Sequence, residues 1–191
     1  MKKDNTKGII RAIKAYVKKF KMDNEPYCAQ VSHVGNKFQL ITPELSMVLK
    51  DSALSCDDDI ILNADVPFQR YHFKTLFPVI NTFNVSQDTR LLIDKVRKLE
   101  KNKKQFEEEN QHFRFIDFDP YMCEFTMAHK EVNNHYIRLN SNAIKTALRV
   151  ISMCGDSRVQ LCYDKTVPYK FPLLMFFEHG VFIIKSEDSN I

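Results

Sequence analysis

The stretch YIRLNSNAIKTALRVI, residues 136–151, decides the fold, because it joins a short extended run to an amphipathic helix. Asn140 or Ser141 can begin this helix, since their side-chain oxygens accept hydrogen bonds from the free amides of the first turn. Lys145 and Arg149 fall on its outer side. Its inner side is formed by apolar residues at helical spacing, Ile144, Ala147, Leu148 and Ile151.

Strand-like runs follow this helix, at residues 158–163, 171–177 and 180–185. The same order, a helix and then strands, is expected twice upstream, with helices near residues 8 and 70. We interpret this order as a degenerate repeat of about 65 residues. Helices that are each followed by several strands predict an α+β fold with antiparallel sheet.

The N-terminal segment, residues 7–21, predicts a helix with one apolar and one basic side. The apolar side is formed by Ile9, Ile10, Ile13, Tyr16, Val17 and Phe20. The opposite side carries a continuous basic stripe, Arg11, Lys14, Lys18 and Lys21. Residues 27–34 and 37–42 then predict a β-hairpin around Gly35.

The segment 86–111 leaves two interpretations open. Ser86-Gln-Asp-Thr resembles a helix cap, and a long charged helix to about Gln111 would have a thin apolar stripe, Leu92, Val96, Leu99 and Phe106. The alternative is a strand over 90–96 followed by a solvated loop over 100–111. A further helix is predicted over 70–83, although Pro78 must end or kink it.

The composition indicates a folded, cytoplasmic protein. Hydrophobic residues make up 44% of the 191 residues, which is enough for a packed core. The chain contains no apolar run of about 20 residues, so no membrane span is expected. The five cysteines are scattered and form no C-x-x-C pair, which favours reduced thiols in a cytosolic compartment.

Motifs that carry catalytic chemistry are missing from the sequence. The four glycines cannot form a G-x-G-x-x-G or G-x-x-x-x-G-K loop, and the histidines form no H-E-x-x-H pair. The acidic clusters at residues 57–59 and at Asp117 and Asp119 are interpreted as turns, and a magnesium-dependent nuclease is the minor alternative. We therefore expect no enzyme, no metal and no cofactor.

The C-terminal unit resembles the last repeat of DNA sliding clamps, the processivity rings of replicative polymerases. The resemblance rests on residues 136–151, the strand at 158–163, the segment 167–172 and the strand at 181–185. It implies that the helices line a central hole and present basic residues to DNA phosphates. The implied DNA-binding residues are Arg11, Lys14, Lys18, Lys21, Lys145 and Arg149.

The same resemblance implies a hydrophobic pocket near the C-terminal strand, into which replication proteins insert short peptide motifs. The positions that match it are Pro168, Tyr169, Phe171, Phe182, Ile183 and Ile184. Clamps commonly end in a tail that is similar to Met-Pro-x-Arg. This sequence departs from that pattern, because it continues as KSEDSNI over residues 185–191.

Residues 1–65 are expected to form a first clamp-like repeat and residues 66–191 a second unit, with a charged connector near 97–112. The resemblance implies a processivity factor that encircles or cradles duplex DNA without sequence specificity and tethers a DNA polymerase or another replication protein. A two-domain clamp chain forms a homotrimeric ring, and a monomer that has lost ring closure is a variant of this hypothesis. The alternative is an α+β adaptor that binds and regulates a protein partner without encircling DNA.

Overall fold

The computed structural model describes residues 5–19, 30–42, 44–54, 60–61, 82–105, 114–129, 134–164 and 172–187. The described helices are α1 (Thr6–Lys19), α2 (Thr89–Gln105), α3 (Ser141–Cys154) and the short 3-10 helix η1 (Asp51–Ala53). The first strands are β1 (Gln30–Val34), β2 (Lys37–Ile41), β3 (Leu45–Lys50), β4 (Ile60–Ile61) and β5 (Thr82–Asp88). The later strands are β6 (Phe115–Asp119), β7 (Glu124–Met127), β8 (Ile137–Asn140), β9 (Arg158–Asp164), β10 (Leu173–Phe177) and β11 (Gly180–Ile184).

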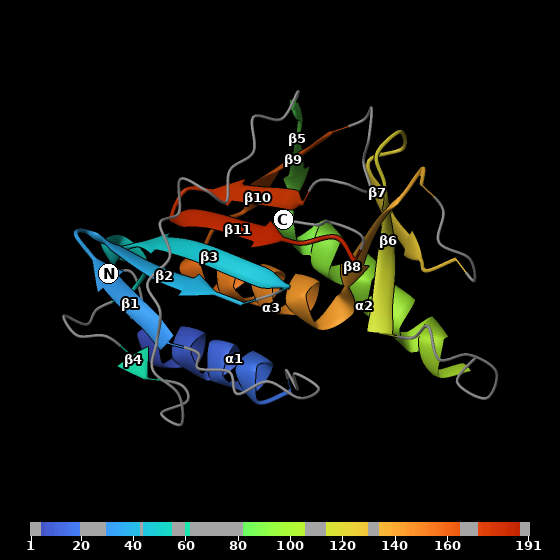
Figure 1. Ribbon diagram of the computed structural model, residues 1–191. Helices are drawn as coiled ribbons and strands as arrows, with labels where there is room; N and C mark the ends of the chain where they lie inside the picture. The colour runs from blue at the N-terminus through green and yellow to red at the C-terminus, as the bar shows by residue number, and fades with distance from the viewer. Residues whose placement is uncertain are drawn as a thin grey trace.

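The strands form two antiparallel sheets, which confirms the predicted α+β class. The larger sheet has eight strands in the order β4-β1-β2-β3-β11-β10-β9-β5, and the smaller one has the order β7-β6-β8. An isolated bridge between Leu139 and Ser186 links β8 to the segment after β11. Helix α3 packs between α1 and α2. In Figure 1 it lies behind the larger sheet.

Helices α2 and α3 each belong to a unit of a strand, a helix and further strands, and the two units exchange the strand that comes before the helix. β5 precedes α2 in the chain but pairs with β9, which follows α3. In the same way, β8 precedes α3 but pairs with β6, which follows α2. Because each unit completes the sheet of the other, residues 82–187 are tied together by pairings between residues that are far apart in the sequence.

The first unit joins this structure through β3. β3 pairs with β11 from Leu45–Ile184 to Leu49–Gly180, so one sheet continues across the predicted boundary at residues 65 and 66. A Cβ atom on Gly180 would lie 2.1 Å from the Val48 carbonyl oxygen, so only glycine permits the strands to come this close. The boundary itself stays a prediction.

Helix α3 confirms the prediction from residues 136–151. Asn140 is its N-cap, and its side chain accepts hydrogen bonds from the amides of Asn142 and Ala143. The four predicted apolar residues are buried in the main core. Gly155 ends the helix in the left-handed conformation, with φ of 84°, which side chains with a Cβ rarely adopt.

Helix α2 decides between the two interpretations of the segment 86–111. The helical interpretation is confirmed and the strand over 90–96 is wrong, because Leu92 and Val96 are buried and Asp88 caps the first turn. The Asp88 Oδ1 atom accepts hydrogen bonds from the amides of Arg90 and Leu91, at 2.8 and 3.1 Å. Residues 97–105 therefore belong to α2. Of the predicted helix over 70–83, residues 70–81 lie outside the described residues, and residues 82–83 belong to β5 instead of a helix.

Candidate nucleic-acid interface

The three long helices carry a strong excess of positive charge. α1 has five basic residues, α3 has two and neither has an acidic one, whereas α2 has seven basic residues and two acidic ones. The helices thus hold half of the 28 basic residues of the chain and only two of its 24 acidic residues. The modest net charge of +4 therefore hides a marked separation of charge within the fold.

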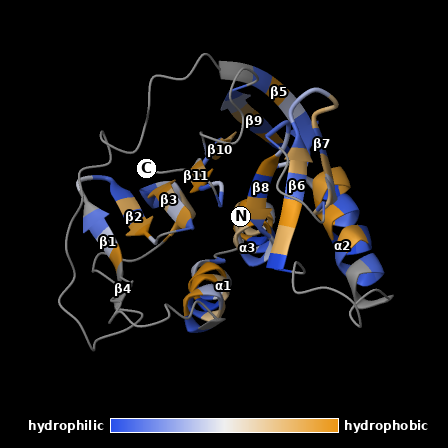
Figure 2. Ribbon diagram, turned by 45° about the vertical axis from the view of Figure 1, so that its right-hand side comes forward, coloured by the Kyte–Doolittle hydropathy of each residue, from blue (hydrophilic) through white to orange (hydrophobic). Residues whose placement is uncertain are grey.

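The basic stripe of α1 lies where its sequence predicts. Arg11, Lys14 and Lys18 are exposed, because Ile9, Ala12, Ile13, Tyr16 and Val17 take up the side that faces the core. In Figure 2 the hydrophobic side of α1 is turned toward the strands and its hydrophilic side away from them. Lys21 lies outside the described residues.

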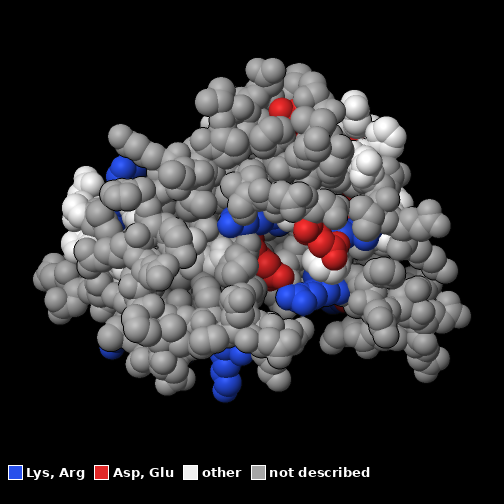
Figure 3. Space-filling view, in the orientation of Figure 1, with Lys and Arg blue, Asp and Glu red and all other residues white. Residues whose placement is uncertain are grey.

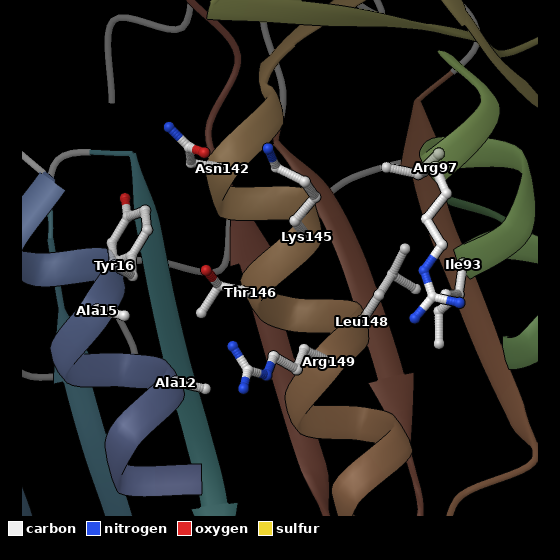
Figure 4. A pocket seen from close by; sticks show the side chains of 11 residues that line it. Ala12, Ala15, Tyr16, Ile93, Arg97, Asn142, Lys145, Thr146, Leu148 and Arg149 are labelled. Carbon is white, nitrogen blue, oxygen red and sulfur yellow. The ribbon is translucent and has the colours of Figure 1, made fainter. Parts of the chain in front are cut away.

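The two predicted cations of α3 differ in their surroundings. Arg149 is exposed, and its guanidinium extends from α3 toward α1 (Figure 4). Lys145 is 39% exposed, and its Nζ atom lies 2.8 Å from Oε2 of Glu100 on α2. One of the two cations is therefore already paired within the protein.

A groove of about 550 Å³ runs across α1, α3 and α2 (Figure 4). Ala12 and Tyr16 of α1 form one wall, Lys145 and Arg149 lie in the middle, and α2 contributes Arg97. The Arg97 side chain is 73% exposed and lies 3.6 Å from Asp94. The groove therefore combines a floor of small and apolar residues with three basic groups, an arrangement that can hold phosphate groups.

Arg97 is the basic residue of the groove that the sequence analysis does not predict. Its signal is the spacing of Ile93, Val96, Arg97 and Glu100, which places all four on one side of a helix. That signal becomes visible only when the helical interpretation of residues 86–111 is chosen.

Among the described residues of the sheets and their turns, basic and acidic side chains are not separated in this way. In the orientation of Figure 3, in which the large sheet lies in front of α3, basic and acidic side chains of the described residues lie next to one another. Two ion pairs of the described sheets and their turns are Arg114–Glu44, at 2.8 Å, and His33–Asp51, at 3.0 Å. Paired surface charges of this kind give little net attraction for a polyanion.

The predicted peptide-binding residues fall into three environments. Phe182 and Ile184 are fully buried in the main core, on the side of β11 that faces the helices. Ile183 is buried on the other side of the sheet, beside Cys162 and Leu174. The remaining three, Pro168, Tyr169 and Phe171, lie outside the described residues. Phe182 and Ile184 therefore present no surface to a partner in this structure.

Asp117 and Asp119 do not form an open pair of carboxylates. Asp119 follows the prediction of a turn, because its Oδ1 atom accepts hydrogen bonds from the amides of Tyr121 and Met122. Asp117 does not lie in a turn. It is 1% exposed, and its Oδ1 atom lies 3.0 Å from Nε of Arg138, which is 4% exposed. His129 contacts the other Asp117 oxygen at 2.8 Å. This carboxylate is thus part of a buried ion pair.

The described cysteines are unpaired, and two of them are unreactive thiols. Cys123, Cys154 and Cys162 are free thiols, and burial raises the pKa of Cys154 to about 12 and that of Cys162 to about 11. The Asp156 carboxylate adds to the effect at Cys154. Both thiols are therefore protonated and unreactive near neutral pH.

In the part of the chain that the structure describes, every helix is too short or too polar to cross a membrane.

Comparison with solved structures identifies the fold. The beta subunit of DNA polymerase from Streptococcus pyogenes has a TM-score of 0.55 at 10% identity, over 95% of this chain and 64% of that one. The Pseudomonas aeruginosa DNA polymerase III subunit beta has a TM-score of 0.53 at 12% identity, over 95% and 64%. The Helicobacter pylori beta clamp bound to a DNA ligase peptide has a TM-score of 0.50 at 8% identity, over 95% and 63%.

The chain therefore has the α+β fold of DNA sliding clamps. It spans about 64% of the length of the beta subunits that it matches. No family model and no curated protein sequence matches it. At 8 to 12% identity the likeness shows the fold alone.

Proposed function

We propose that this chain is a sliding-clamp-like processivity factor that holds duplex DNA against its helices without reading sequence. The observation that carries the proposal is the concentration of basic residues on three adjacent helices in a clamp fold. Contacts to phosphates position a protein on a duplex but do not distinguish bases, which suits a protein that moves along DNA.

The exposed cations set the expected strength and salt dependence of binding. Each phosphate contact on a duplex releases condensed counterions, so the slope of log affinity against log salt changes by about 0.9 per contact. Arg11, Lys14 and Lys18 of α1 and Arg149 of α3 are exposed and can all make such contacts. Binding should therefore weaken steeply as salt rises.

The test is the binding of a fluorescent duplex of arbitrary sequence over a range of salt concentrations. The double variant R11E/K14E should lose affinity by at least about tenfold and show a shallower salt slope. The matched control is K37E/K50E, which changes the same net charge at two exposed residues that face each other across β2 and β3. Equal losses in both variants, or no binding by the wild-type protein, would contradict the proposal.

Tethering of a DNA polymerase or another replication protein is the second part of the proposed function. One neighbour in fold carries a DNA ligase peptide, which supports a peptide site on this fold. Because Phe182, Ile183 and Ile184 are all buried here, we propose that the peptide contacts of this chain are made by Pro168, Tyr169 and Phe171. The proposed assembly is a homotrimeric ring, and a monomer is its variant.

A protein-binding adaptor is the alternative, and one observation favours it. Among the described residues, three large hydrophobic side chains are exposed, Leu91, Tyr121 and Met122. They belong to neighbouring segments, because Gln87 before α2 donates a hydrogen bond to the Cys123 carbonyl oxygen at 2.7 Å. Exposed apolar surface of this kind is typical of protein-binding sites. An adaptor would bind its partner with little response to salt, which the same titration would reveal.

A further inference from the structure

Glu100 lies on the side of α2 that borders the basic groove. It follows Ile93, Val96 and Arg97 at helical spacing, and all three of these residues line the groove. Its Oε2 atom accepts a hydrogen bond from Lys145 Nζ at 2.8 Å, and the Glu100 side chain is only 28% exposed. Glu100 therefore reaches from α2 to α3 and places a carboxylate on a cation of the groove.

The acidic residues of the helices are confined to this place. α1 and α3 have none, and the two of α2 each pair with a groove cation, Asp94 with Arg97 and Glu100 with Lys145. The Asp94 pair is the looser one, because its atoms are 3.6 Å apart and its side chains are 63% and 73% exposed. Glu100 thus makes the shorter and more shielded of the two contacts.

We propose that Glu100 is an internal competitor of DNA phosphate at Lys145 and limits the affinity of the helices for duplex. The inference rests on the proposed DNA binding and names a regulating residue of that site. A phosphate that approaches Lys145 must either displace the carboxylate at 2.8 Å or lie beside its negative charge, so most of the attraction is cancelled in both cases. Exposed cations such as Arg149 carry no such cost.

This competition would suit a protein that must grip DNA and still move along it. Sequence-independent binding through many cations becomes slow to rearrange when every contact is strong. A carboxylate that replaces a phosphate as each contact breaks would keep Lys145 paired at every step.

The test is duplex binding by E100Q over a range of salt concentrations. Loss of the carboxylate should raise the affinity severalfold and steepen the salt slope by about 0.9, because Lys145 becomes available for one more phosphate. The double variant E100Q/K145Q should lose this gain. In the E100Q background, K145Q should weaken binding about as much as R149Q does, since both cations are then available to phosphates.

The matched control is E124Q. Glu124 makes an ion pair with Lys95 of α2 at 2.8 Å, but it does so from β7, away from the groove, and its loss changes the net charge equally. An unchanged affinity in E100Q, or an equal gain in E124Q, would overturn the role of Glu100 while duplex binding stands. Loss of duplex binding in both the wild-type protein and E100Q would overturn the proposed function as well. Circular dichroism of each variant checks that it is folded.

Discussion

At the scale of single residues, the least expected feature is the ion pair between Asp117 and Arg138. Both side chains are almost completely buried, and they connect β6 to β8 within the smaller sheet. Arg138 also donates a hydrogen bond to the carbonyl oxygen of His129, at 2.7 Å. A charge at such depth is tolerated only while it has its partner. The pair therefore fastens β8, the strand directly before α3, to β6.

Replacement of Asp117 by asparagine should destabilise the protein strongly. D117N removes the carboxylate at 3.0 Å from the buried Arg138 guanidinium and leaves the more distant Glu187 carboxylate, at 3.9 Å, which should cost about 3 kcal/mol of the free energy of unfolding. Urea denaturation followed by circular dichroism measures this loss. D119N is the control, because Asp119 only accepts hydrogen bonds from two turn amides, so it should cost about 1 kcal/mol. Similar values for the two variants would argue against a buried ion pair.

At the scale of elements, the sequence predicts what local interactions determine. The cap and the apolar side of α3 are contained in one short stretch, so both are predicted correctly. The apolar stripe of α2 is thin and lies among charges, so local spacing alone leaves it open between a helix and a strand. The exchange of β5 and β8 between units depends on pairings between residues that are 70 to 82 and 19 to 25 positions apart, which periodicity does not reveal.

The seam between β3 and β11 provides a test at this scale. G180A should separate the two strands, because the new Cβ atom would lie 2.1 Å from the Val48 carbonyl oxygen and the Leu49 Cα atom would lie 3.1 Å away. Backbone atoms in a sheet cannot move aside without loss of hydrogen bonds. Hydrogen exchange of the β3 amides should therefore become faster by at least about tenfold in G180A.

The control for this substitution is G8A in α1. There the added Cβ atom meets only the flexible Met153 side chain, at 3.4 Å, and alanine favours a helix over glycine by about 1 kcal/mol. G8A should leave the exchange of the β3 amides unchanged or slow it. Unchanged exchange in G180A would mean that β3 and β11 are less closely joined than the structure shows.

At the scale of the whole molecule, the separation of charge is visible only once the helices are assembled. The sequence alone predicts the stripe of α1 and the two cations of α3, but it does not show that Arg97 joins them or that Glu100 occupies Lys145. Such relations depend on distances between side chains of different helices. The candidate peptide site shows the same limit, because spacing cannot distinguish the core side of β11 from its other side.

The assembly of the chain is the prediction that decides between clamp and adaptor. The match to the first beta subunit covers 95% of this chain and 64% of that one, and the proposed homotrimeric ring predicts three copies in solution. Light scattering over a range of protein concentrations and at two salt levels should give a stable mass of about three chains. Ring closure through paired sheet edges should hold in both salt conditions, because backbone hydrogen bonds are not screened as surface charges are. A strict monomer would mean that the fold does not close a ring by itself, and the exposed side chains Leu91, Tyr121 and Met122 would then make the adaptor the stronger proposal.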